Sequence, residues 1–249
     1  MIAYYTTYNE IHLLPLQHEW CKNQGIQMYV LDNCSNDGTK EYLEKHKIRH
    51  RTIDTCDAFD LRPLLIEMTR QIHADKPDWF IYSGMDMFFV TSRLTIPQLA
   101  NMAGIMGYNM ITMEQITFYH TRPDMADKPD LNPFRSNFHF RPNNMRTFIS
   151  EYCPEINIKP DNIVRPNPRP FTDKQGLICE MNAGKPIANR IENLKRRQKA
   201  WDNGMNRNHG SHYRTLAARG FIFPESEQTD IRTIPEKFAL YRKLQAVYE

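Results

Sequence analysis

Residues 79–89 read WFIYSGMDMFF, an apolar run that one acidic residue, Asp86, interrupts before the run resumes. A continuous apolar run of this kind is typical of a strand that is covered on both faces. Open α/β sheets bind their ligands at the carboxyl ends of such strands. We therefore expect Asp86 to point into a cleft, where its oxygens could hold a divalent cation that in turn binds phosphate. The alternative is a solvated acid at a strand end, without a function.

Short apolar runs alternate with helical patterns from residue 1 to about residue 118. This alternation predicts βαβ units and an α/β fold with a single, mostly parallel sheet flanked by helices. The sequence Thr-Ile-Pro-Gln at 95–98 is a capping signature and predicts a helix start. Besides 79–89, the predicted strands are 2–7, 27–31, 48–53 and 109–118, and the predicted helices are 11–23, 39–46, 61–73 and one after Thr95.

The composition of the sequence changes after Tyr119, where Pro, Asn, Arg and Asp replace the long apolar runs. Such a stretch predicts long loops built on a sheet, and long loops in compact domains tend to bind ligands or cover sites. Residues 230–249 carry apolar side chains at helical spacing. They predict an amphipathic helix that docks on the domain or on a partner.

Composition excludes several classes of protein. The 249 residues carry a net charge of +3, too little for a dedicated nucleic-acid binder. The basic run at 195–199 indicates a solvated helix face rather than a nucleic-acid patch. Five cysteines without a C-x-x-C pair favour neither a disulfide framework nor a structural zinc site, so we expect a reducing, cytoplasmic location. The chain shows no signal-peptide pattern and no apolar run of about 18 residues.

Two polar loops follow the first two predicted strands. Residues 5–10 read YTTYNE and residues 31–39 read LDNCSNDGT, and each stretch leads into a predicted helix. Because the carboxyl ends of parallel strands meet at one edge of the sheet, we expect these loops to lie side by side. Their Asp and Asn side chains can accept from a base or a ribose, and the turn offers backbone N–H groups to an anion.

The order and spacing of Tyr8-Asn9-Glu10, residues 32–39 (DNCSNDGT), Arg62 and Gly84-Met85-Asp86 resemble a family 2 glycosyltransferase with the A-type nucleotide-diphosphosugar transferase fold. The resemblance covers about the first half of the chain. It implies a nucleotide-sugar-binding half at 1–118, an acceptor and metal-site half at 119–229 that is rich in loops, and a C-terminal helix at 230–249.

The resemblance also implies a UDP- or GDP-sugar donor. Asp32 would contact the nucleotide base, and Asp86, the final acid of the family's D-x-D motif, would bind the metal that bridges the donor diphosphate. The chain departs from this motif, because Gly84 replaces its first acid. The donor-binding residues that we expect are Thr7, Asn9, Glu10, Asp32, Ser35, Asp37, Arg62 and Met85.

A hard cation such as Mn²⁺ or Mg²⁺ needs more ligands than Asp86 and a diphosphate supply. Transferases of this type commonly add a His from the C-terminal region, and His209 and His212 are the candidates here. The alternative for this pair is a turn of surface histidines. We expect His120 and His139 to be structural or acceptor-loop residues.

The implied chemistry is displacement of the nucleoside diphosphate by an acceptor hydroxyl, as on a glycan. The metal would stabilise the leaving diphosphate. An inverting enzyme also needs a carboxylate base near the acceptor, and Glu114 and Asp124 are the candidates. We expect the apolar side chains at 85 and 87–89 to belong to the core rather than to an acceptor platform.

Four alternatives stay open. A nucleotidyltransferase has the same fold but usually carries a Gly-rich basic loop after the first strand, which residues 8–12 do not resemble. An inactive nucleotide- or glycan-binding module is favoured by Gly84. Nucleic-acid binding through residues 190–207 is the third. Peripheral contact of the basic segment and the terminal helix with an anionic membrane surface is the fourth.

Overall fold

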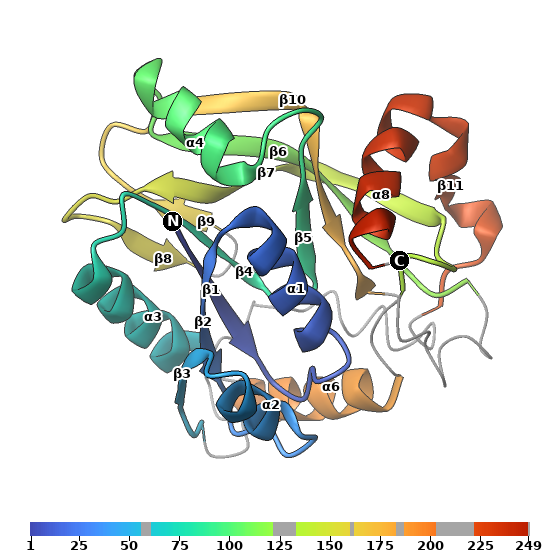
Figure 1. Cartoon of the computed structure of the whole chain (residues 1–249). Coiled ribbons are helices and arrows are strands. Elements are labelled where there is room, and N and C mark those ends of the chain that lie inside the picture. Colours follow the sequence, from blue (N-terminus) through green and yellow to red (C-terminus); the bar gives the residue numbers. More distant parts are fainter. Residues whose placement is uncertain (56–60, 122–132, 160–161, 183–186, 203–221, 249) are drawn as a thin grey trace.

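The computed structural model describes residues 1–55, 61–121, 133–159, 162–182, 187–202 and 222–248. Helices flank a large mixed sheet that has nine strands among these residues, which confirms the predicted α/β fold (Figure 1). The strands are β1 (Ile2–Thr7), β2 (Gln27–Asp32), β3 (Arg49–Thr52), β4 (Trp79–Gly84), β5 (Met87–Val90), β6 (Met110–Phe118), β7 (His139–Glu151), β10 (Pro170–Glu180) and β11 (Thr229–Asp230), with β8 (Asn157–Lys159) and β9 (Asn162–Val164) in a separate hairpin. The helices are α1 (Leu14–Gln24), α2 (Thr39–Lys45), α3 (Leu61–Asp75), α4 (Ile96–Ile105), α6 (Ile187–Asp202) and α8 (Pro235–Val247), with short 3₁₀ turns η2 (Glu225–Glu227) and η3 (Ile231–Thr233).

The first half of the sheet is parallel and runs in the order β3-β2-β1-β4. Each crossover between these strands contains one of the helices α1, α2 and α3, as the alternating sequence pattern predicts. In the register of the sheet Thr7 lies opposite Asp32, and Thr6 lies opposite Gly84. The carboxyl ends of three neighbouring strands therefore meet at one edge.

The second half of the sheet corrects the expectation of long loops after Tyr119. The 13-residue strand β7 pairs antiparallel with both β4 and β6, and the 11-residue strand β10 lies between β6 and β5. The sheet is therefore mixed rather than mostly parallel. Residues 141–145 of β7 read RPNNM and are all exposed, so this part of the strand lacks the apolar pattern by which strands are predicted.

The C-terminal helix α8 docks on the domain, as its sequence pattern predicts. It packs against β5, β10 and α1 and buries Leu240, Tyr241 and Leu244. The Tyr241 hydroxyl donates to the carbonyl oxygens of Asn137 at 2.5 Å and Phe134 at 3.2 Å. These contacts join the end of the chain to the segment that precedes β7.

Helix α4 begins with the capping box that the sequence predicts. The Gln98 backbone N–H donates to Thr95 Oγ1 at 3.4 Å, and the Thr95 N–H donates to Gln98 Oε1 at 2.8 Å. We expect Thr95→Ala to lower the free energy of unfolding by about 1 kcal/mol, because a donor of the first turn loses its acceptor. Urea unfolding measures this change. Thr95→Ser is the control and should retain most of the stability; an equal loss in both variants would contradict a capping role.

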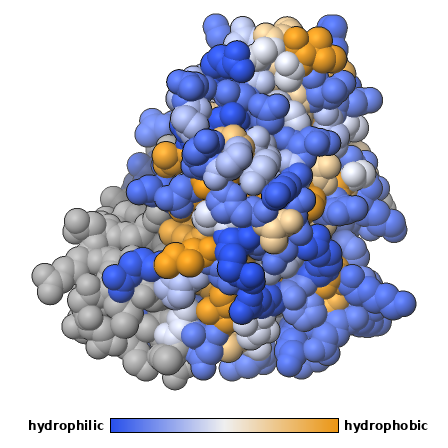
Figure 2. All heavy atoms as spheres, turned by 90° about the vertical axis from the view of Figure 1, so that its left-hand side faces the viewer, coloured by the Kyte–Doolittle hydropathy of each residue, from blue (hydrophilic) through white to orange (hydrophobic). Residues whose placement is uncertain are grey.

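The face of the molecule that carries α3, α4 and the β8–β9 hairpin is mostly hydrophilic, with hydrophobic side chains scattered among polar ones (Figure 2). Ile66 on α3 and Ile105 on α4 are 70% and 79% exposed. Scattered apolar residues of this kind are normal on a protein surface. None of the helices in the described ranges has the length and hydrophobicity that crossing a membrane requires.

Candidate functional site

The loops after β1 and β2 interlock through Asn9. The Asn9 N–H donates to Ser35 Oγ, and Asn9 Oδ1 accepts from the Asn36 N–H, both at 2.9 Å. Asn9 has a positive φ of 52°, a conformation that asparagine tolerates better than most residues. The two loops therefore lie side by side, as expected, and hydrogen bonds join them into one unit.

Asp32 is fully buried at the end of β2. Its carboxylate accepts from Ser35 Oγ at 2.5 Å and from the Ser35 N–H at 3.2 Å. Burial raises the pKa of this carboxyl, and the hydrogen bonds from Ser35 oppose that rise. A buried acid with a raised pKa is characteristic of functional positions.

Asp37 and Glu10 also lie in this unit. Asp37 accepts from the Ile11 N–H at 3.0 Å and from the Thr39 hydroxyl at 2.6 Å, so it ties the second loop to the first. The hydroxyl of Thr7 donates to Glu10 at 3.2 Å. The structure thus brings together six expected donor-binding residues, which are Thr7, Asn9, Glu10, Asp32, Ser35 and Asp37.

Asp86 lies in the tight turn between β4 and β5 and is 6% exposed. A Cβ atom on Gly84 would lie 2.7 Å from Asp86 Oδ1, so the absent side chain at 84 leaves room for the Asp86 carboxylate. The backbone carbonyl of Asp86 accepts from the Met181 N–H at 2.8 Å, which ties the turn to the end of β10. Met85 is fully buried in the core, so any donor contact at this position would come from its backbone.

The divalent cation that the resemblance implies is compatible with these residues. No three His, Cys, Asp or Glu side chains gather in a metal-binding cluster within the described part of the chain. Mg²⁺ in nucleotide sites often takes only one or two carboxylates and completes its shell with phosphate oxygens and water. Asp86 can supply such a carboxylate. His209, His212 and Asp124 lie outside the described residues.

The structure does not bring Glu114 to Asp86. Glu114 lies opposite Leu177, which in turn lies opposite Val90, at the end of β5 that is remote from Asp86. Its carboxylate accepts from Lys237 of α8. Arg62 is exposed in the first turn of α3.

Glu180 is a carboxylate near Asp86 that the sequence analysis missed. It ends β10, opposite Thr117 of β6 and Met87 of β5, so it lies at the end of β5 that follows Asp86. Its side chain accepts from Gln115 Nε2 and Thr117 Oγ1 at 2.7 Å each, and from Asn182 Nδ2 at 3.0 Å. Acidic side chains thus follow β2, β1 and β4, and the Asp86 turn brings them next to the end of β10.

Arg196 of α6 is an exception to the solvated helix face predicted for residues 195–199, whereas Lys195 is exposed as predicted. The guanidinium carbon of Arg196 lies 3.5 Å from the centroid of the Tyr8 ring, and the Arg196 side chain is 7% exposed. The Tyr8 hydroxyl donates to Glu192, one turn earlier on the same helix. Figure 1 shows α6 at the lower edge of the sheet, where β1 and β2 end.

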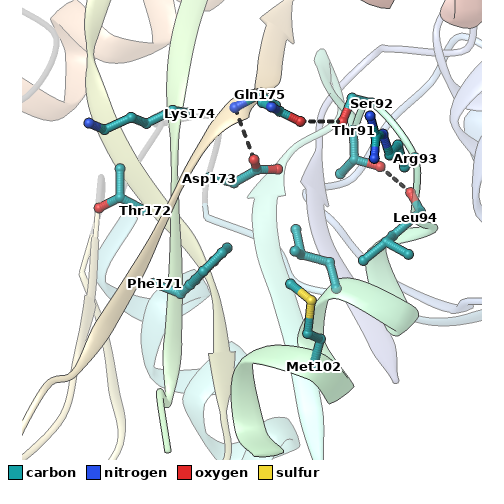
Figure 3. Close-up of a pocket in the computed structure, with 11 residues that line it drawn as sticks. Thr91, Ser92, Arg93, Leu94, Met102, Phe171, Thr172, Asp173, Lys174 and Gln175 are labelled. Carbon is teal, nitrogen blue, oxygen red and sulfur yellow. Dashed lines mark hydrogen bonds between the residues drawn. The ribbon is translucent and has the colours of Figure 1, made fainter. Parts of the chain in front are cut away.

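A pocket of 440 Å³ lies at the opposite end of the β5–β10 pair (Figure 3). It is formed by the segment after β5, by α4 and by the start of β10, where Asp173 accepts from the Gln175 N–H at 3.0 Å. Burial raises the pKa of Asp173. Because β5 and β10 separate this pocket from Asp86 and Glu180, it is not part of the edge described above.

Comparisons with known proteins give distant structural similarity. No family model and no curated protein matches the chain. A crystal structure of part of TarS from S. aureus aligns with 99% of this chain and 82% of that chain, at 12% identity and a TM-score of 0.44. TarS in complex with UDP-GlcNAc aligns over 51% and 38% of the two chains, at 14% identity and a TM-score of 0.36.

A second similar structure is HddC from Yersinia pseudotuberculosis, complexed with GMP-PN. It aligns over 80% of this chain and 98% of that chain, at 11% identity and a TM-score of 0.41. The chain spans only 21% of the longer TarS structure that it matches. At these values the similarity in chain path is distant.

Proposed function

We propose that this chain binds a nucleotide-diphosphosugar and transfers its sugar to an acceptor hydroxyl, with a divalent cation as cofactor. The observation that carries this proposal is the interlocked pair of loops at the ends of β1 and β2, next to Asp86. These loops offer buried acceptors to a base and a ribose. A carboxylate at the neighbouring strand end suits the phosphates and their cation.

Each part of the edge has a role in the proposed reaction. Asp32 and Asn9 orient the nucleoside, and Asp86 holds the cation, together with His209 or His212. A Mn²⁺ or Mg²⁺ ion held by these residues would supply positive charge that offsets the charge developing on the leaving diphosphate. Glu180 accepts the proton of the attacking hydroxyl, because the register of β10 with β5 places Glu180 opposite Met87, the residue that directly follows Asp86. Asp124 stays a second prediction for this base.

The proposed donor site predicts metal-dependent nucleotide binding. We expect UDP or GDP with Mn²⁺ or Mg²⁺ to raise the unfolding temperature, since a ligand at 100 times its Kd stabilises the native state by about 2.7 kcal/mol. Asp86→Asn should remove the effect of the metal, and Asp32→Asn should weaken binding with or without metal. A thermal-shift titration measures both changes.

Asp78→Asn is the matched control for these variants, because Asp78 is exposed just before the other end of β4. It should bind nucleotide like the wild type. If no nucleoside diphosphate shifted the wild type in saturating metal, the proposed donor site would be wrong. Nucleotide binding that ignored metal, together with no turnover of any donor, would instead favour an inactive binding module, the candidate that Gly84 supports.

A further inference from the structure

Arg196 is a buried cation whose donors are only partly used. Its side chain is 7% exposed, and its Nε and Nη1 atoms have no hydrogen-bond partner within the described part of the chain. The flat face of the guanidinium lies on the Tyr8 ring, so the N–H groups at the edge of the guanidinium can donate hydrogen bonds to other groups. Because a buried charged donor without an acceptor is costly, the position indicates an anionic ligand.

The position of Tyr8 places this cation at the strand ends. Tyr8 follows β1 directly, and in the register of β1 with β4 the last pair is Thr6 with Gly84. Tyr8 and Asp86 each lie two residues beyond this pair, Tyr8 after β1 and Asp86 after β4. Arg196 thus covers the end of the strand next to the one that leads to Asp86.

The charges of the edge require such a cation. The segments that follow β1, β2 and β4, up to the next helix or strand, contain acidic residues but neither Lys nor Arg. A diphosphate placed among these carboxylates would be repelled unless cations offset the charge. A guanidinium is suited to this task, because its planar fork binds two phosphate oxygens at once.

Glu192 keeps Arg196 in place. Glu192 and Arg196 are one helical turn apart, and the first accepts from the Tyr8 hydroxyl while the second covers the Tyr8 ring. Tyr8 is therefore fixed to α6 at two points. The contact orients the guanidinium before any ligand arrives, which lowers the cost of binding.

We propose that Arg196, oriented by Tyr8, binds the diphosphate group of the donor. This inference rests on the proposed function, and it assigns to α6 a part in the donor site that the sequence pattern does not reveal. Arg196 is a binding residue in this role, and it acts on the same phosphates as the cation at Asp86.

The test compares Arg196→Gln with Lys195→Gln by calorimetric titration with UDP, GDP, UMP, GMP and inorganic pyrophosphate in Mg²⁺. Both variants remove one positive charge from α6, but Lys195 is exposed. We expect Arg196→Gln to weaken diphosphate binding about 10- to 100-fold and so to remove the advantage of a diphosphate over a monophosphate. Lys195→Gln should leave both affinities unchanged.

An equal loss in the two variants, or no loss in Arg196→Gln, would overturn the assignment. If the wild type bound no nucleotide, the proposed function would fail, and the titration with pyrophosphate alone would test the role of Arg196. Pyrophosphate binding that is present in the wild type and lost in Arg196→Gln would support this role. No pyrophosphate binding to the wild type would reject it. Arg196→Lys, which keeps the charge but not the fork, should show an intermediate loss. Should Arg196→Gln fail to fold, the Nε–H resonance of Arg196 in the wild type must shift on addition of pyrophosphate.

Discussion

Sugar transfer by a Glu180→Gln variant is expected to fall by about 10² to 10⁴, the usual contribution of a positioned general base. The amide cannot accept the proton of the acceptor hydroxyl, whereas its oxygen can keep the hydrogen bonds from Gln115 and Thr117. Nucleoside diphosphate binding should stay unchanged, because in the proposed reaction this residue acts on the acceptor and not on the nucleotide. Turnover of a panel of UDP- and GDP-sugars, measured as released nucleotide in the presence of acceptor, gives the result.

Glu114→Gln is the matched control, since it makes the same chemical change on a neighbouring strand. Glu114 is paired with Lys237 and lies at the far end of β5 from Asp86, so this variant should retain most of the activity. The opposite result, in which Glu114→Gln is inactive and Glu180→Gln is active, would support Glu114 as the base, a role for which the sequence analysis names it as a candidate. Equal activity in both would leave Asp124 as the base.

Truncating Phe134 is expected to cost about 3 to 5 kcal/mol of unfolding free energy, the range for removing a buried aromatic ring. Phe134 is fully buried, and its ring centroid lies 4.9 Å from that of Phe88 and 5.2 Å from that of Tyr248. Phe134→Ala would leave a cavity between β5 and the C-terminal helix. Urea unfolding followed by circular dichroism measures the loss.

Ile105→Ala is the control for this prediction, because Ile105 is 79% exposed at the end of α4. Its effect should lie within about 0.5 kcal/mol. A loss of less than about 1 kcal/mol in Phe134→Ala would mean that the α8 interface contributes little to the stability of the domain.

Local signals explain which elements could be predicted from the sequence. The start of α4 follows from residues 95–98 alone, because the capping box is made by neighbours in the chain. The parallel half follows from apolar runs that alternate with helical ones. By contrast, β7 is a strand because β4 and β6 supply hydrogen-bond partners on both sides, and its exposed polar residues give no pattern of their own.

The same distinction explains the candidate site. The interlocked loops could be predicted, since both follow strands whose pairing the sequence pattern implies. The position of Glu180 beside Asp86 could not be predicted, because it depends on the pairing of β10 with β5 and β6. Arg196 stands in a basic run that looks uniformly solvated, and its burial depends on Tyr8, which lies near the other end of the chain.

The position of β7 between β4 and β6 limits where the chain could be divided into fragments that fold, or are inherited, separately. The composition of the sequence changes near Phe118, so this point resembles a domain boundary. Trp79, Phe80 and Ile81 of β4, however, pair with β7 residues that come after that point. A gene fragment that stopped at Phe118 would encode an open, apolar sheet edge, the kind of edge that recruits other chains into aggregates. Residues 1–118 are therefore no transferable module, and recombination at this boundary should yield insoluble products.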